Sequence, residues 1–313
     1  MRVNSLAYPV AFIAAIVALM SVGRLGIAQS LLFGIMMYVI LAEAVNILFG
    51  FTGYLPLGLG AFFGVGAYTF AILVTSHNWD VASATVMALL ISAGTGALIA
   101  PLTRLKGPYY GISSLVMQFV ISAIIVNLPK EIASNVTDIS LVRIYNPNLT
   151  YVFSLTGFAV ALAVTYYVKN SKYGLAFRAI KDDEQVAAMA GVKTARYRAI
   201  VSIIAAVLAG YAGILYGWFY SFLYPEAVFD IAIPTLATIV AIFGGLRTVV
   251  GPVLGAAVLY TVQVYLSGAL SGAYILLWVP LFAVFLILIV LFLPHGIMDI
   301  LYKRFPSLRT ALQ

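Results

Sequence analysis

Long apolar segments occupy most of this chain, and each has about the length that a helix needs to cross a lipid bilayer. Such a helix takes roughly 20 consecutive apolar residues, because it must pass through a hydrocarbon layer about 30 Å thick. Of the 313 residues, 64% are hydrophobic and only 9% are charged, whereas soluble domains carry roughly 25% charged residues. The chain is therefore predicted to be an all-α polytopic integral membrane protein, with a single transmembrane domain over residues 1–313.

Turn residues and charges divide the apolar sequence into about ten predicted spans. Glycines cluster around Pro56 between residues 50 and 66, so the third span is expected to be a broken or re-entrant helix in this region. The predicted spans are 7–23, 29–51, a third that ends near 75, 81–102, 108–128, 151–168, 199–220, 231–244, 250–266 and 274–293.

The basic residues predict how these spans are oriented. Cytoplasmic loops of membrane proteins carry an excess of Lys and Arg. With both termini in the cytoplasm, 14 of the 17 basic residues fall on that side and only Arg24, Lys130 and Arg143 fall outside. A multi-pass protein of the plasma or inner membrane is therefore expected. The same rule explains the net charge of +7, so we expect no nucleic-acid partner.

Several kinds of chemistry have no counterpart in this sequence. There is no cysteine, and the two histidines, His77 and His295, lie far apart, so we expect no metal site. The phosphate-binding pattern G-x-x-x-x-G-K-[ST] does not occur, so no cofactor is expected on this chain. The sequence contains neither an H-E-x-x-H pair nor a pair of intramembrane aspartates, so no motif indicates an enzyme.

Polar residues inside the spans are the candidates for a substrate pathway. A carboxylate such as Glu43 costs roughly 2.5–3.5 kcal/mol inside a membrane, so it should face the bundle interior or water. It could bond to a neighbouring helix or serve the pathway. The glycines of the broken segment could likewise allow tight packing or line a route for substrate. The predicted pathway residues are Glu43, Asn46, Gly53, Tyr54, Pro56, Gly58, Gln118, Gly244 and Gly245.

One polar stretch, residues 169–198, interrupts the apolar sequence and holds seven of the 17 basic residues. Its first half carries an apolar face with helical spacing, which indicates an amphipathic helix at the membrane interface. Its second half begins with acidic residues and ends at Gly191, a pattern typical of a short capped helix. The exposed apolar face expected there, around Val186 and Met189, suits a groove on a protein better than lipid.

This polar stretch resembles the cytoplasmic loop of ABC importer permeases, in which an Ala-Ala pair followed by Gly docks on the ATPase. Four other stretches, in their order and spacing, are similar to branched-chain amino acid permeases of the LivM type. They are 64–68, 244–246, 251–256 and 293–296. The resemblance implies an ATPase-coupling role for Arg178, Asp183, Glu184, Ala187, Ala188 and Gly191.

The same resemblance implies the partners. ATP and Mg would bind separate ATPase subunits, a second homologous permease would complete the pair, and an extracytoplasmic binding protein would deliver substrate. Glu226, Asp230 and the predicted outer loop 129–150 are the expected docking residues for that protein. Pro56 and Leu59 stand where the LivM type commonly has Ser and His, so other amino acids or urea remain possible cargoes. An ion-gradient-driven secondary transporter is the alternative class, with Glu43 as the ion-binding group.

Overall fold

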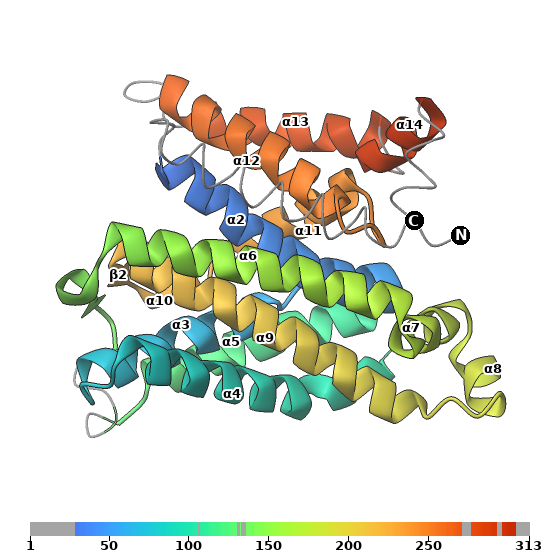
Figure 1. The fold of residues 1–313 in the computed structure, drawn as a ribbon, viewed down its shortest axis with the longest axis horizontal. Helices are drawn as coiled ribbons and strands as arrows, with labels where there is room; N and C mark the ends of the chain where they lie inside the picture. Colours follow the sequence, from blue (N-terminus) through green and yellow to red (C-terminus); the bar gives the residue numbers. More distant parts are fainter. Residues whose placement is uncertain are drawn as a thin grey trace.

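The computed structural model describes residues 29–105, 107–129, 132, 136–270, 277–292 and 296–304, and these residues are mainly helical (Figure 1). Among them, seven helices are long and apolar enough to cross a membrane, and two shorter helices are also apolar. The fold is that of a multi-pass helical membrane protein. The first predicted span, 7–23, lies outside the described residues, so the count of about ten spans stays a prediction.

The element bounds follow the chain order used in Figure 1. They are α2 (Gln29–Val45), η1 (Asn46–Gly50), α3 (Gly60–Thr75), α4 (Val81–Ile99), η2 (Ala100–Arg104), α5 (Pro108–Val126), β1 (Ile139–Ser140), η3 (Val142–Ile144), α6 (Pro147–Asn170), α7 (Lys172–Asp182), α8 (Glu184–Met189), α9 (Thr194–Tyr220), β2 (Phe222–Leu223), α10 (Pro225–Val228), α11 (Ala232–Gly244), α12 (Gly251–Ala269), α13 (Trp278–Phe292) and α14 (Gly296–Arg304).

Short polar side chains set the starts of several helices. Asp80, Asn146, Ser171 and Asp183 each accept backbone N–H bonds from the first turn of the helix that follows. Such caps satisfy donors that the first turn of a helix otherwise leaves unpaired.

Helix α2 forms the centre of the bundle. Leu32 is buried, and so is every residue from Met36 to Val45. It packs against α6 and α9 on one side and against α11 and α12 on the other, as Figure 1 shows. Outer helices expose apolar side chains instead, such as Leu98 of α4 at 74% and Ile124 of α5 at 59%. Exposed leucine and isoleucine on this scale are typical of surfaces that face lipid.

The predicted helix break is present at residues 53–59, between the turn that follows η1 and the start of α3. This segment runs beside α5, and the Gly58 N–H donates to the Ser114 hydroxyl at 3.1 Å. A Cβ on Gly58 would lie 1.8 Å from the Ser114 carbonyl oxygen, so only glycine allows this approach. Because Ser114 lies well inside α5, helix α3 begins part of the way across the bundle.

The polar stretch and the two short strands lie at opposite ends of the bundle (Figure 1). We call these the α7–α8 end and the β1–β2 end. The strands pair antiparallel, with Ile139 opposite Leu223. The chain was expected to be all-α, and this two-residue pairing is a small addition to a mainly helical fold. It forms because residues 136–145 fold back on the end of α9, where Trp218 Nε1 donates to the Ile144 carbonyl at 3.0 Å.

Two helices extend beyond the spans predicted from the sequence. Helix α6 covers 147–170 rather than 151–168, so it takes up the last residues of the predicted outer loop 129–150. Helix α9 begins at Thr194 rather than 199, so it includes the end of the polar stretch. Both helices continue beyond their apolar segments because polar residues that face solvent are compatible with helical backbone.

Candidate functional site

The residues at the α7–α8 end form the first candidate site, and helix α7 is its base. Ser171 caps α7. The predicted apolar face is present, and it packs on protein. Phe177 is fully buried and its ring meets that of Tyr197 on α9 edge to face, with centroids 6.2 Å apart. Arg178 bonds back to its own chain, donating to the Gly174 carbonyl at 3.1 Å and to the Lys169 carbonyl at 3.4 Å.

Helix α8 projects from this base with an exposed apolar tip. Val186 is 57% exposed and Met189 is 81% exposed. Ala188 is also exposed, whereas Ala187 faces inward and is buried. The predicted exposed apolar face of the second half of the polar stretch is therefore present.

Two features fix the position of α8. Its first residue, Glu184, forms an ion pair with Arg198 of α9, and both side chains are largely buried, at 17% and 11% exposed. Its far end closes at Gly191, whose φ of +86° lies in the left-handed region. The Val192 N–H donates to the Ala187 carbonyl and the Gly191 N–H to the Ala188 carbonyl, both at 3.0 Å. This pattern is a Schellman motif, so the predicted cap is confirmed.

Lys181 connects α7 to the start of the helix break. Its Nζ donates to the Gly50 carbonyl at 2.9 Å, and Arg247 Nε donates to the same oxygen at 3.1 Å. The Lys181 side chain also lies against Gly53, with Cγ 3.4 Å from the place where a Cβ would be. Burial lowers the pKa of Lys181, the charge of Arg247 lowers it further, and Asp182 opposes both effects. The side chains of Lys181 and Arg247 therefore both bond to the Gly50 carbonyl oxygen, close to where the helix ends and extended chain begins.

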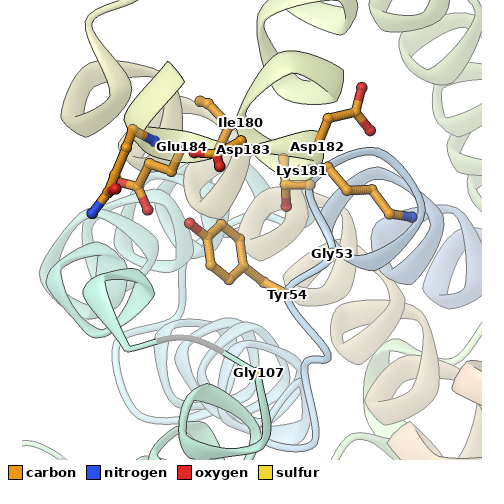
Figure 2. A pocket seen from close by; sticks show the side chains of 10 residues that line it. Gly53, Tyr54, Gly107, Ile180, Lys181, Asp182, Asp183 and Glu184 are labelled. Carbon is orange, nitrogen blue, oxygen red and sulfur yellow. Dashed lines mark hydrogen bonds between the residues drawn. The ribbon is translucent and has the colours of Figure 1, made fainter. Parts of the chain in front are cut away.

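A cavity of about 340 Å³ opens between this break and the start of α8. It is lined by residues 52–54, Gly107 and residues 180–185. Figure 2 shows the Tyr54 ring lying across the cavity, with its hydroxyl directed toward the segment that carries Asp183 and Glu184. Tyr54 is only 6% exposed and interacts with both Glu184 and Arg198. The cavity thus joins the α8 ion pair to the broken segment.

The inner end of the break is held by a second set of polar contacts. Gln118 is completely buried, and its Nε2 donates to the Phe229 carbonyl at 2.8 Å. A Cβ on Gly60, the first residue of α3, would lie 2.6 Å from Gln118 Oε1. Gln118 therefore joins the start of α3 to the segment that precedes α11.

Glu43 and Asn46 form a buried network and do not line the cavity at the α7–α8 end. Glu43 Oε2 accepts from Thr165 Oγ1 at 2.8 Å and from Asn46 Nδ2 at 3.0 Å. Asn46 also holds the turn between α11 and α12, accepting from the Arg247 N–H at 2.7 Å and donating to the Thr248 carbonyl at 2.8 Å. Of the predicted alternatives, the bond to a neighbouring helix is present. Glu43 Oε1 is buried without a hydrogen-bond partner.

The predicted pathway residues therefore fall into three groups instead of one channel. Gly53 and Tyr54 line the cavity at the α7–α8 end, Pro56, Gly58 and Gln118 lie along the break, and Glu43 and Asn46 meet the turn after Gly244 and Gly245. Lys181 and Arg198 also belong to the site, although the sequence did not identify them. Their charges were visible in the sequence, but their partners lie on other elements. Within the described residues, no cluster of His, Cys, Asp and Glu could hold a metal ion.

Comparisons with known proteins place this architecture in a family. Residues 26–293 match the family described as Branched-chain amino acid transport system / permease component. The high-affinity branched-chain amino acid transport system permease protein LivM of Salmonella typhimurium is 26% identical over 256 residues, covering 72% of this chain and 60% of the relative. LivM of Escherichia coli gives the same identity and coverage.

A second relative matches a shorter part of the chain. LivH of Salmonella typhimurium is 33% identical over 141 residues, covering 45% of this chain and 44% of the relative. The match to the LivM relatives spans about 60% of their length. No solved structure gives a significant match. Because the family match extends over most of the sequence, this chain belongs to the branched-chain amino acid transport system permease family.

Proposed function

We propose that this chain is a permease subunit of an ABC importer and that it carries branched-chain amino acids across the inner membrane. The observation that carries the proposal is the link from the exposed helix α8, through α7 and Lys181, to the helix break. A permease driven by a separate ATPase needs such a connection between its docking surface and its transport path. The relatives are named as permease proteins of branched-chain amino acid transport systems, which agrees with this cargo.

In the proposed mechanism, the exposed tip of α8 enters a groove on an ATPase subunit. ATP and Mg bind the ATPase, and closure of its subunits moves α8. The Glu184–Arg198 ion pair would pass this movement to α9, and the Lys181–Gly50 bond would pass it to the break. Because α3 begins inside the bundle, movement of the break would reposition the start of α3. Alternating access of transporters commonly works around such discontinuous helices.

The distribution of charge supports a cytoplasmic location for the α7–α8 end. Most basic residues of the polar stretch lie at this end of the bundle, and so does Arg247. Basic residues favour the cytoplasmic side of a membrane. The β1–β2 end would then face the opposite side, where a substrate-binding protein would dock near Glu226 and the loop before α6. Both chain termini would be cytoplasmic.

A second, homologous permease chain is the proposed partner within the membrane. The sequence is similar to both LivM and LivH, which are two differently named permease proteins in the same organism. A heterodimer of related chains would provide two α8 surfaces for a pair of ATPase subunits. The remaining exposed apolar faces would contact lipid.

The proposal is tested by purifying the chain together with its candidate ATPases and partner permease and reconstituting the assembly in liposomes. We expect uptake of radiolabelled leucine to need ATP and the binding protein, and to persist when an ionophore collapses ion gradients. Uptake of urea alone would keep the ATP-driven permease and change its cargo. Uptake that ignores ATP but stops with the ionophore would replace the proposal with the ion-gradient-driven alternative.

A further inference from the structure

A second cavity, of about 370 Å³, lies near the β1–β2 end between α2, α9, α11 and α12. Pockets that bind small organic ligands have volumes that begin at about this size. Its polar lining comprises Tyr38, Tyr216, Tyr220, Asp230, Tyr260, Gln263 and Ser267. Among the described residues that line it, none is Lys, Arg or His, so they offer acceptors and aromatic rings but no fixed positive charge.

The tyrosine rings form two walls from three different helices. Tyr38 of α2 and Tyr260 of α12 have ring centroids 5.1 Å apart. Tyr216 and Tyr220, one turn apart on α9, have centroids 4.6 Å apart. Tyr38 is buried and Tyr220 is 47% exposed, so the aromatic lining extends from the interior to the surface.

Two oxygen acceptors complete the lining. Asp230 is exposed, and its Oδ1 accepts from the Ala232 N–H at 2.9 Å, which holds the carboxylate at the start of α11. Gln263 Oε1 is buried and has no hydrogen-bond partner. A buried polar atom without a partner is costly unless something occupies the space beside it. Among the described residues no donor reaches Gln263 Oε1, so this acceptor is open to a ligand.

These groups together match a small organic cation. A carboxylate attracts an ammonium group, and the faces of tyrosine rings attract it as well. Met37, Ile233 and Val264 add apolar surface that suits a short hydrocarbon chain. Gln263 Oε1 is an acceptor for the ammonium group, and tyrosine hydroxyls can donate to a carboxylate on the same ligand.

We propose that this cavity is an entry site that receives an apolar amino acid, with its α-ammonium group held by Asp230 and the tyrosine rings. That the natural ligand is an amino acid rests on the proposed transport function. That the cavity prefers an ammonium group rests only on its own lining. Asp230, expected from the sequence to contact a binding protein, is thereby assigned to the substrate.

The test uses a thiol placed in the cavity of the assembled transporter. The chain has no cysteine, so Ser267→Cys introduces a single thiol into the lining, in an assembly whose partner chains have had any cysteines replaced. The rate of its reaction with N-ethylmaleimide is measured with leucine, with isoamylamine, which lacks the carboxylate, and with 4-methyl-2-oxopentanoate, which lacks the ammonium group. We expect leucine and isoamylamine to slow the reaction at concentrations at least about tenfold lower than the oxo acid does, since tenfold corresponds to one modest polar interaction.

Variants in the same background assign the effect to named side chains. Asp230→Asn retains an oxygen that can cap α11 and should raise the protecting concentration of leucine at least about tenfold. Asp80→Asn makes the same change at the start of α4, outside the lining, and should leave that concentration unchanged. Tyr260→Phe should retain more protection than Tyr260→Leu, because Phe keeps the ring face. The two Tyr260 variants test the site independently if the transporter carrying Asp230→Asn fails to assemble.

Equal protection by the oxo acid, or protection that neither Asp230→Asn nor Tyr260→Leu weakens, would overturn the entry site. ATP-driven leucine uptake by the wild-type assembly is measured in parallel. Uptake without this pattern of protection removes the entry site and leaves the proposed function standing. Protection by isoamylamine without ATP-driven uptake of any amino acid supports the cation site and removes the proposed function.

Discussion

The Lys181 ammonium group donates a hydrogen bond to the Gly50 carbonyl at 2.9 Å, joining two residues 131 positions apart in the sequence. Gly50 ends the π-helical turn that follows α2, and Lys181 lies in the last turn of α7. The bond therefore connects the surface proposed for the ATPase to the interruption between α2 and α3. A movement of α7 could reach the interior of the bundle through this bond.

This bond should make transport sensitive to alkaline pH. Burial and the nearby Arg247 charge lower the pKa of Lys181, so its proton is lost at a lower pH than that of an ordinary lysine. Below that pKa the ammonium group donates a charge-assisted bond, and above it the bond weakens. We expect ATP-driven uptake to fall as the pH rises through this pKa. Lys181→Arg, which stays charged, should move the fall to higher pH, and an unchanged profile in that variant would contradict the role of Lys181.

The Glu184–Arg198 ion pair should act as a unit. Replacing either residue alone leaves a largely buried partner unpaired, which we expect to lower the free energy of unfolding by about 2 kcal/mol. Glu184→Gln and Arg198→Met should each reduce uptake, and the double variant should lose less than the sum of both. Thermal unfolding of the four proteins in a double-mutant cycle measures the coupling. Additive losses would show that the two side chains act independently.

Gly191 should be needed for its backbone conformation alone. A Cβ at this position would meet nothing within 4 Å, but φ is +86°. Gly191→Ala should therefore cost about 1 kcal/mol through backbone strain and reduce leucine-stimulated ATP hydrolysis. Gly191→Asn should cost less, because asparagine tolerates this conformation. Gly94→Ala is the matched control, since its Cβ also meets nothing and its helical backbone accepts alanine. Equal activity of Gly191→Ala and Gly94→Ala would refute this role.

Glu43 should be a structural residue and not an ion-binding one. Glu43→Gln keeps an oxygen that can accept from Thr165 and Asn46, so ATP-driven uptake should continue. Glu43→Leu removes both bonds and should lower the free energy of unfolding by about 1–3 kcal/mol. Uptake and thermal stability are measured on both variants. Loss of uptake in Glu43→Gln with unchanged stability would favour the ion-coupled alternative.

The sequence was sufficient for those features that depend on local pattern. Apolar length predicted the membrane-spanning helices, glycine density predicted the break at 53–59, and Asp183 and Gly191 predicted the two ends of α8. Each of these features depends on residues that are close together in the chain, so one window of sequence contains the cause.

Contacts between helices could not be predicted from the sequence, for a physical reason. Helices such as α2 and α4 are apolar on nearly all faces, so no periodicity shows which face meets which neighbour. The partner of Glu43 on α6, the ion pair of Arg198 and the Lys181–Gly50 bond all depend on these unseen rotations. The tyrosine-lined cavity needs four helices to be placed correctly, and no window of sequence contains them.

The measurement that tests the coupling account most directly is ATP hydrolysis and leucine uptake by the reconstituted assembly with Lys181→Met in this chain. Methionine retains the length of the side chain but cannot donate to Gly50. We expect the ATPase to copurify and basal hydrolysis to continue, while uptake falls about tenfold, the equivalent of a charged hydrogen bond of about 1.4 kcal/mol at a partly exposed site. Lys193→Met, an exposed lysine in the same stretch, should transport normally. Uptake by Lys181→Met at the wild-type rate would contradict the account.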